Sequence, residues 1–311
     1  MAYKLAEINS AVRADPASFV RECNEEFHDK IMLAADMVMY NIEKSPILLI
    51  SGPSGSGKTT TSMKIEEELE SRGIGSYALG MDSYYKTVDE TSPRLPNGEL
   101  DLESPFCLDM ELLGRHFEDL AAGREIEVPA YNFAQQRRES EPSERIKLGK
   151  NEIVVVEGIH ALNDMVTHYQ PEAMKLYISA RSDVKDEAGK VCFKGTWMRL
   201  VRRLVRDKLY RGAAPEYTMK LWGNIRRGEK DYIGPFKGKA NFRFDSSLPY
   251  EVGLMRGFAQ SFFLNVPDCE RSAELKKIYT AFDLFEPVSA ELIPDNALLR
   301  EFIGGGKYKQ V

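Results

Sequence analysis

The sequence predicts an α/β protein in which a parallel β-sheet is flanked by helices, with a helical arm before it and further helices after it. Two observations carry this prediction. Short apolar runs rich in β-branched residues alternate with longer amphipathic segments, which is typical of strands buried on both faces and of the helices that cover them. In addition, the apolar run at 47–50 leads directly into a glycine-rich loop. We expect an arm over 1–45, an α/β domain over 46–285 and a tail over 286–311.

Composition narrows the class of protein. The chain has 311 residues, of which 43% are hydrophobic, enough for a sizeable core, and a net charge of −6. This acidic balance argues against nucleic acid or an anionic membrane as a partner. No apolar run approaches the ~20 residues of a membrane span, and the first residues show no secretion signal. Four scattered cysteines without a C-x-x-C pair predict reduced thiols and a cytoplasmic protein.

The N-terminal arm, residues 1–45, is predicted to be helical. Its apolar residues recur at helical spacing, as seen for Phe19, Val20, Cys23, Phe27, Ile31 and Ala34. Pro46 marks the boundary to the first strand. The arm carries no recognisable chemistry, so packing on the domain or dimerisation is the default interpretation, and a homo-oligomer stays open.

The glycine-rich loop matches the P-loop pattern G-x-x-x-x-G-K-[ST] at every fixed position. Glycines let backbone N–H groups approach phosphate oxygens, the helix that starts near Thr59 adds its dipole, and Lys58 adds a charge. The Thr59 hydroxyl suits Mg²⁺. The flanking strand and amphipathic helix argue against a chance match. We therefore predict a P-loop NTPase-type sheet whose nucleotide-binding residues are Gly52, Ser54, Gly55, Ser56, Gly57, Lys58, Thr59 and Thr60.

A second strand, predicted over 76–81, leads into Asp82. In an open parallel sheet, ligands bind at the carboxyl ends of the strands. A carboxylate there, close to the γ-phosphate of a nucleotide, suits a general base for a hydroxyl group and a contact to Mg²⁺. The alternative for a lone aspartate after a strand is a helix cap, which would be preferred without the P-loop.

The segment 87–105 is polar, rich in turns and too long for an ordinary connection, which indicates a functional or disordered loop. A helix over 108–122 and an extended stretch over 125–133 follow. The extended stretch ends in Tyr131 and Phe133, with two glutamines and two arginines shortly behind. These aromatic side chains suit stacking on a planar ring. The alternative is that they form the core face of a strand.

The run over 151–161 is the best candidate for a central strand, because it is continuous and β-branched. Glu157, at its end, would lie beside the P-loop, where it is placed to bind the metal ion or its waters. His160 follows, but no partner pattern surrounds it and no role is assigned to it. Another strand is predicted over 174–180.

A strongly basic helix is predicted over 196–212. From Lys194 to Arg211, seven basic residues stand against one acidic residue. Three of the arginines, Arg199, Arg203 and Arg206, share a face beside the apolar stripe. A solvated basic face is the simple interpretation. The excess of positive charge in an acidic protein favours instead an arginine lid over the γ-phosphate, where phosphoryl transfer develops negative charge.

The remaining segments predict packing elements. They are a helix over 214–233, a strand over 241–244, and helices over 249–263 and 272–285. The tail, 291–311, holds a short apolar helix that ends in three glycines, and no function is assigned to it.

Together these motifs resemble the uridine kinase branch of the phosphoribulokinase/uridine kinase family. The similarity spans roughly residues 46–250. Besides the P-loop, the matching stretches are Asp82-Ser83-Tyr84-Tyr85, Tyr131-Asn132-Phe133, Val155-Val156-Glu157-Gly158-Ile159, the basic stretch 202–207, Arg211-Gly212 and the stretch 232–237.

The resemblance implies a kinase that uses ATP or GTP with Mg²⁺ and phosphorylates the 5′-hydroxyl of a nucleoside. It implies that Asp82 is the base and that the phosphates are contacted by Lys58, Arg203 and Arg206. The implied Mg²⁺ residues are Thr59, Glu157 and Asp82. The implied nucleoside site consists of Asp82, Tyr85, Glu103, Tyr131, Phe133, Gln136, Arg138 and Arg211.

Three positions depart from the family pattern. Glu103-Ser104-Pro105 stands where the family has Asp-His-Pro, whose acid holds the ribose hydroxyls. Gln136 replaces the histidine that reads the pyrimidine edge, and Ala213 replaces the second arginine of Arg-Gly-Arg. Because the catalytic parts match while the base-reading parts differ, a strict preference for uridine or cytidine is not implied.

Two other functions stay open at this point. One is a kinase of another small alcohol, such as a phosphorylated pentose or a pantothenate-like molecule. The other is a regulator that binds a nucleotide, hydrolyses it slowly and signals by shape. Asp82 and the basic helix favour transfer, because a switch needs neither a base on the acceptor side nor a cover. The fold alone does not decide among the three.

Overall fold

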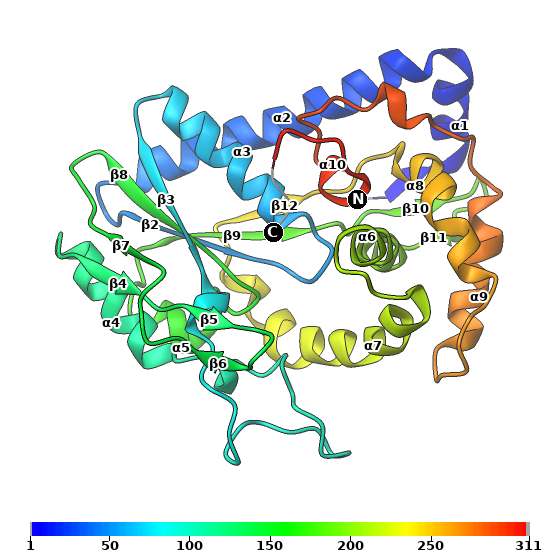
Figure 1. Ribbon diagram of the computed structural model, residues 1–311. Coiled ribbons are helices and arrows are strands. Elements are labelled where there is room, and N and C mark those ends of the chain that lie inside the picture. The colour runs from blue at the N-terminus through cyan, green and yellow to red at the C-terminus, as the bar shows by residue number, and fades with distance from the viewer. Residues whose placement is uncertain (1, 309–311) are drawn as a thin grey trace.

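The centre of the computed structural model, which describes residues 2–308, is a sheet of five parallel strands (Figure 1). Across the sheet the order is β12, β9, β2, β8, β3. These strands are β2 (Ile47–Ser51), β3 (Gly75–Gly80), β8 (Glu152–Glu157), β9 (Met174–Ser179) and β12 (Phe242–Asp245). All five coincide with stretches predicted as strands, so the α/β fold class is confirmed.

The strands are buried on both faces because their side chains alternate between two hydrophobic cores. Leu48 and Ile50 of β2 lie in the larger core, whereas Ile47 and Leu49 lie in the smaller one. The side chains of β8 alternate in the same way. Each strand therefore needs an apolar residue at nearly every position, which explains the continuous apolar runs in the sequence.

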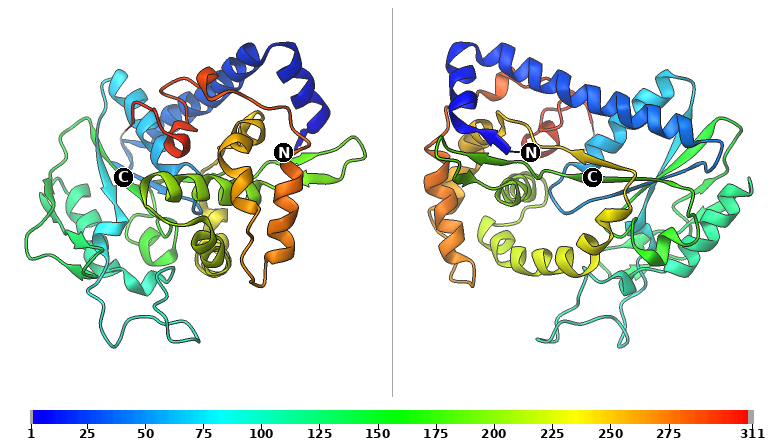
Figure 2. Two further views of the ribbon diagram at one scale, coloured as in Figure 1. Left: turned by 45° about the vertical axis from the view of Figure 1, so that its right-hand side comes forward. Right: turned by 180° about the vertical axis from the view of Figure 1, so that it is seen from behind.

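Helices cover both faces of the sheet. The larger core is covered by α1 (Leu5–Ala14), α2 (Pro16–Asn41), α3 (Lys58–Ser71), α6 (Gly195–Tyr210), α7 (Pro215–Gly228), α8 (Glu251–Ala259), α9 (Ser272–Phe282) and α10 (Arg300–Ile303). The smaller core is covered by α4 (Met110–Ala121) and α5 (Asp164–Thr167). Figure 2 shows α2 as a long rod along one side of the molecule. Among residues 2–308, no helix is long and apolar enough to cross a bilayer.

The prediction that the N-terminal arm is helical is wrong at its start. Residues Ala2–Lys4 form strand β1, which pairs in parallel with β10 (Asp183–Lys185), and β10 pairs with β11 (Val191–Phe193). The Tyr3 hydroxyl also donates to the carbonyl oxygen of Ser247 at 3.0 Å. A strand of three residues is too short to show a period, so only its distant partner reveals it.

The chain between β3 and β8 forms smaller elements at one end of the molecule (Figure 1). They are the 3-10 turns η1 (Met81–Tyr84) and η2 (Pro105–Cys107) and the β4–β7 ladder (Ile126–Val128 with Glu144–Ile146). They also include a hairpin whose strands, β5 (Tyr131–Asn132) and β6 (Arg137–Arg138), have two residues each. Further short helical turns are η3 (Glu229–Ile233), η4 (Gly234–Lys239), η5 (Gln260–Phe263) and η6 (Ala290–Leu292).

Candidate active site

The P-loop connects the end of β2 to the start of α3 and closes tightly on its surroundings. A Cβ atom at Gly52 would lie 2.0 Å from the carbonyl oxygen of Ile178, so only glycine fits there. Gly57 has φ +78°, a conformation that side chains with a Cβ atom rarely adopt. These backbone requirements turn the chain sharply enough for α3 to begin at Lys58, with its first N–H groups at the carboxyl edge of the sheet.

The predicted Mg²⁺ residues lie together at this edge. The Thr59 hydroxyl donates to Glu157 Oε1 at 3.3 Å. This contact follows from the register, because β2 and β8 are neighbours and Ile50 stands opposite Glu157. Burial raises the pKa of the Glu157 carboxyl, the Lys58 charge opposes that shift, and the Asp82 charge adds to it. A hydroxyl beside carboxylates is a set of oxygen donors that fits Mg²⁺.

Asp82 lies in η1, immediately after β3, and its side chain remains open to solvent. The cap position of η1 is Gly80, so Asp82 is not the cap of that turn. The surrounding protein raises the pKa of the Asp82 carboxyl, while the charges of Lys58 and Arg211 favour its ionised form. Asp82 therefore combines the access and the basicity that a proton acceptor needs.

Helix α6 lies against the P-loop and presents its arginines in two ways. Arg203 Nη1 donates to Ser54 Oγ at 2.8 Å, and Arg206 lies near the start of α3, 3.6 Å from the Glu301 carboxylate. Arg199 instead is buried, pairs with Glu229 at 2.5 Å and donates to the backbone carbonyl of Ser54. The helix is therefore not a solvated basic face, and only two of the three arginines on the predicted face border the phosphate side.

Three aromatic residues predicted for the nucleoside site form one cluster. The ring centroids of Tyr85, Tyr131 and Phe133 lie 5.0–5.8 Å apart. Phe133 is 61% exposed, so it does not belong to the core face of a strand. Gln136 follows at the exposed tip of the hairpin with φ +52°. Arg138 is engaged with Asp109 at 3.0 Å and with the carbonyl oxygens of Tyr84 and Tyr85.

Glu103 is half-buried, with the charges of Arg203 and Lys58 among its neighbours. Burial raises the pKa of its carboxyl to about 7, while the charges of Lys58 and Arg203 act in the opposite direction. Gly228 of α7 makes room for it, since a Cβ atom there would lie 2.4 Å from the Cβ atom of Glu103. Arg211 is exposed and pairs with Asp207 at 3.4 Å.

Glu103 should make the stability of the protein depend on pH. Its pKa is about 7 in the folded protein against 4.5 for an ordinary glutamate, so the folded state holds its proton over a range in which the unfolded chain has lost it. Stability from this group is therefore present below about pH 4.5 and is lost as pH rises to about 7. Glu103→Gln should melt progressively higher relative to wild type across this range, as followed by circular dichroism.

The exposed Glu90→Gln variant is the matched control for that series, because it removes a carboxylate from the same loop. Its melting temperature should stay parallel to that of wild type. A Glu103→Gln difference that is the same at every pH would contradict the assigned protonation of Glu103.

Three further contacts of the site join residues far apart in the sequence, and no local pattern predicts them. Glu301, in the tail, accepts a hydrogen bond from the Thr60 N–H at 3.2 Å. The other two are the buried pairs of Arg199 with Glu229 and Arg202 with Glu251. Arg202 also donates to the Ser246 carbonyl at 2.9 Å, and the Ser246 hydroxyl donates to the Ser56 carbonyl at 2.5 Å, which supports the P-loop from behind.

Residues 47–250 match the sequence profile of the phosphoribulokinase/uridine kinase family. A uridine kinase of Staphylococcus epidermidis is 30% identical over 203 residues, which cover 64% of this chain and 87% of that protein. A uridine kinase of Staphylococcus aureus is 31% identical over 206 residues, with the same coverage of 64% and 87%.

Among solved structures, D-glycerate 3-kinase from Cryptococcus neoformans aligns with a TM-score of 0.42 at 12% identity, over 67% of this chain and 89% of that one. This likeness is too low to support an inference about function. The family match covers about two thirds of the chain and includes the P-loop, Asp82, Glu157 and α6. The chain therefore belongs to the phosphoribulokinase/uridine kinase family and is a P-loop kinase.

Proposed function

We propose that this kinase transfers the γ-phosphate of ATP or GTP to the 5′-hydroxyl of a nucleoside. The observation that carries the proposal is the place of Tyr85. Its ring contacts Tyr131 and Phe133, and the pKa of its hydroxyl is raised by burial and then by the charges of Asp82 and Glu103. Flat apolar surfaces and carboxylates thus lie near one another, which suits a base joined to a neutral ribose.

In the proposed reaction, the 5′-oxygen attacks the γ-phosphorus, its proton passes to the Asp82 carboxylate, and the bond to the β-phosphate oxygen breaks. Lys58, Arg203 and Arg206 stabilise the negative charge on the phosphates. Mg²⁺, held by Thr59 and Glu157, would add further neutralising charge when bound. Glu103 would accept hydrogen bonds from the ribose hydroxyls, the role that the family resemblance implies for it.

A phosphorylated pentose is a poorer acceptor for these residues because it needs a second site for an anion. The segments expected to line the acceptor site are 82–86, 103–105 and 131–138, and their positive residues are Lys86, Arg137 and Arg138. Arg138 is already paired with Asp109. Asp82 and Glu103, when ionised, would also repel a sugar phosphate. The charges of these segments therefore support a neutral acceptor.

A side-by-side assay of ADP and GDP release tests the proposal with ribulose 5-phosphate, pantothenate and the common nucleosides as acceptors. We expect turnover with nucleosides, and with more than one base, because Gln136 and Ala213 stand where the family has its base-reading residues. Turnover of either non-nucleoside without any nucleoside would contradict the proposal. Equal nucleotide hydrolysis with and without acceptors would favour the regulator instead.

We also propose that the kinase acts in the cytoplasm, which is supported by the absence of a disulfide among its four cysteines. Its kinase domain would span 46–285, preceded by the arm over 1–45 and followed by the tail over 286–311. Limited proteolysis of the purified chain tests this division. Protease cuts that accumulate within 46–285 but outside the exposed loop 87–105, while both ends stay intact, would contradict it.

A further inference from the structure

The tail of the chain lies against the P-loop, although it is outside the stretch that matches the family. We call residues 290–308 the C-terminal strap. Its Leu298 side chain is buried so close to the P-loop that a Cβ atom at Gly57 would lie 2.7 Å from Leu298 Cδ1. At its end, Lys307 and Tyr308 both bond to Glu67 of α3, at 3.0 and 2.8 Å. The strap is therefore fixed to the loop and helix that form the phosphate site.

The strap has a defined shape of its own. Arg300 donates to four of its backbone carbonyls, those of Ala290, Ile293, Pro294 and Gly304, at 2.6–3.4 Å. Leu299 and Phe302 are fully buried beside it. This internal frame determines where the neighbouring Glu301 side chain points.

Glu301 reaches the phosphate-binding end of α3. Its Oε2 atom accepts a hydrogen bond from the Thr60 N–H at 3.2 Å, and its Oε1 atom lies 3.6 Å from Arg206 Nη1. Thr60 is the third residue of α3, so its N–H is one of the donors that have no partner within the helix. In a P-loop, such N–H groups bind the phosphates of the nucleotide. A carboxylate thus occupies a donor that a phosphate oxygen would use.

Charge balance explains why the carboxylate rests there. Without Glu301, Arg206 would face the positive charges of Arg203 and Arg211, with Asp207 as the remaining acid among its charged neighbours. Glu301 supplies a negative charge on the phosphate side of Arg206. A bound phosphate would supply the same charge to the same two donors. The two anions therefore compete for one place.

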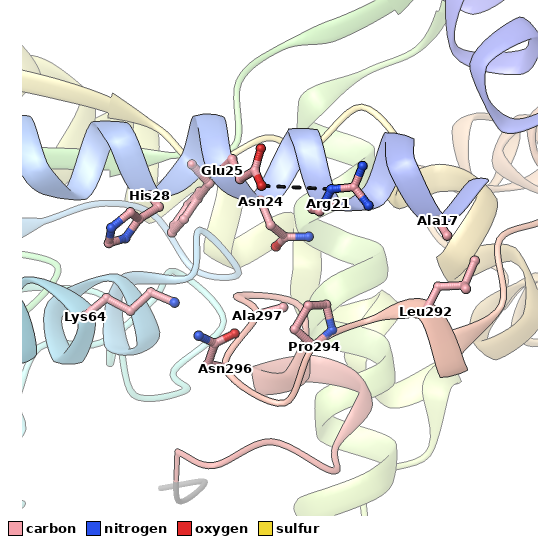
Figure 3. A pocket seen from close by; sticks show the side chains of 11 residues that line it. Ala17, Arg21, Asn24, Glu25, His28, Lys64, Leu292, Pro294, Asn296 and Ala297 are labelled. Atoms are coloured by element: carbon pink, nitrogen blue, oxygen red, sulfur yellow. Dashed lines mark ion pairs between the residues drawn. The ribbon is translucent and has the colours of Figure 1, made fainter. Parts of the chain in front are cut away.

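The other side of the strap leaves room for movement. A pocket of about 290 Å³ separates part of the strap from α2 and α3 (Figure 3). Leu292, Pro294 and Asn296 form the strap side of this pocket, and Arg21 and Lys64 lie across from them. At the start of the strap η6 packs against α2, so the space beside 294–297 is where the strap can shift when a nucleotide displaces Glu301.

We propose that Glu301 is an affinity-determining residue of the nucleotide site: its carboxylate binds the Thr60 N–H and pairs with Arg206, and it must leave these groups when the nucleotide binds. The strap thereby determines how tightly the kinase binds its phosphate donor, ATP or GTP, and the nucleotide product. This inference rests on the P-loop of a kinase and not on the nature of the acceptor.

The test is the affinity of the full chain for ADP, measured by titration calorimetry. Glu301→Gln keeps the shape of the side chain and removes its charge, so ADP should bind roughly tenfold more tightly than to wild type. Glu291→Gln, which removes an exposed carboxylate from the same strap, should bind ADP like wild type. Unchanged or weaker ADP binding by a Glu301→Gln protein with a wild-type melting temperature would overturn the proposal.

Hydrogen exchange of the wild-type chain gives a second, independent result. Saturation with ADP should increase exchange of the amides over 297–308, because the nucleotide displaces Glu301 from α3. Slower exchange there would mean that the strap closes on the nucleotide, which contradicts competition. Neither measurement needs an acceptor, so a failure to phosphorylate nucleosides leaves both results interpretable. Wild-type protein that does not bind ADP would instead contradict the nucleotide site itself.

Discussion

Replacement of Lys58 by alanine should lower kcat by roughly 10²–10³-fold, as expected for the loss of a charge that stabilises the transition state. The lysine influences the carboxyl groups of Asp82, Glu103 and Glu157, and for each of them its charge favours the ionised form. The variant would therefore lack the positive charge that lies beside the transferred phosphate. The pKa of the proposed base, Asp82, would also rise. Steady-state kinetics with the best acceptor from the assay above measures both effects.

The effect of Lys58→Ala should fall on kcat more than on nucleotide affinity, since the N–H groups of the loop remain. Lys150→Ala is the matched control, because Lys150 is exposed in a turn before β8. Thermal unfolding should show that both variants fold. A folded Lys58→Ala protein with near-normal kcat would contradict the position assigned to the phosphates.

Replacement of Asp82 by asparagine should reduce acceptor phosphorylation by roughly 10²–10⁴-fold, the usual cost of losing a general base. Asparagine keeps the shape of the side chain but cannot take the proton of the hydroxyl. In the wild-type enzyme the raised pKa of Asp82 should appear as a rate that increases as pH rises through that pKa. The pH–rate profile of Asp82→Asn should lack this acidic limb.

Asp29→Asn, which changes an exposed aspartate on α2, serves as the control for Asp82→Asn. Its rate should equal that of wild type at every pH. A loss of less than a few fold in the Asp82→Asn enzyme, with the acidic limb intact, would reduce Asp82 to a structural residue of η1.

Much of the phosphate side could be predicted because its elements follow one another directly in the sequence. A buried strand, a glycine-rich turn and an amphipathic helix follow each other within about two dozen residues, and each has its own sequence signal. The place of Glu157 also followed, since a continuous β-branched run predicts a central strand and parallel strands end at one edge of the sheet. Register then brings Glu157 to Thr59.

The remaining features depend on partners that periodicity does not specify. Helical spacing places Arg199 on the same face of α6 as Arg203 and Arg206. Spacing within one helix cannot show that Arg199 is buried and paired with Glu229 of another helical segment. The contact of Glu301 with Thr60 was even harder to predict, because 241 positions separate the two residues. A short helix near the end of a chain carries no signal for such a contact, and only the packed tail brings the two residues together.

The burial of Arg199 and Arg202 has a consequence for how new activities can arise on this scaffold. Arg199 is ion-paired with Glu229 and Arg202 with Glu251 inside the protein, and both donate hydrogen bonds to backbone carbonyls of the P-loop. A change of either arginine would leave an unpaired buried charge and would be strongly destabilising. The proposed acceptor side consists of a long loop and of a hairpin whose strands have two residues each, with exposed side chains, where substitutions are far better tolerated. Natural selection can therefore exchange the acceptor of this kinase by altering its periphery, while the part that handles the phosphates stays the same.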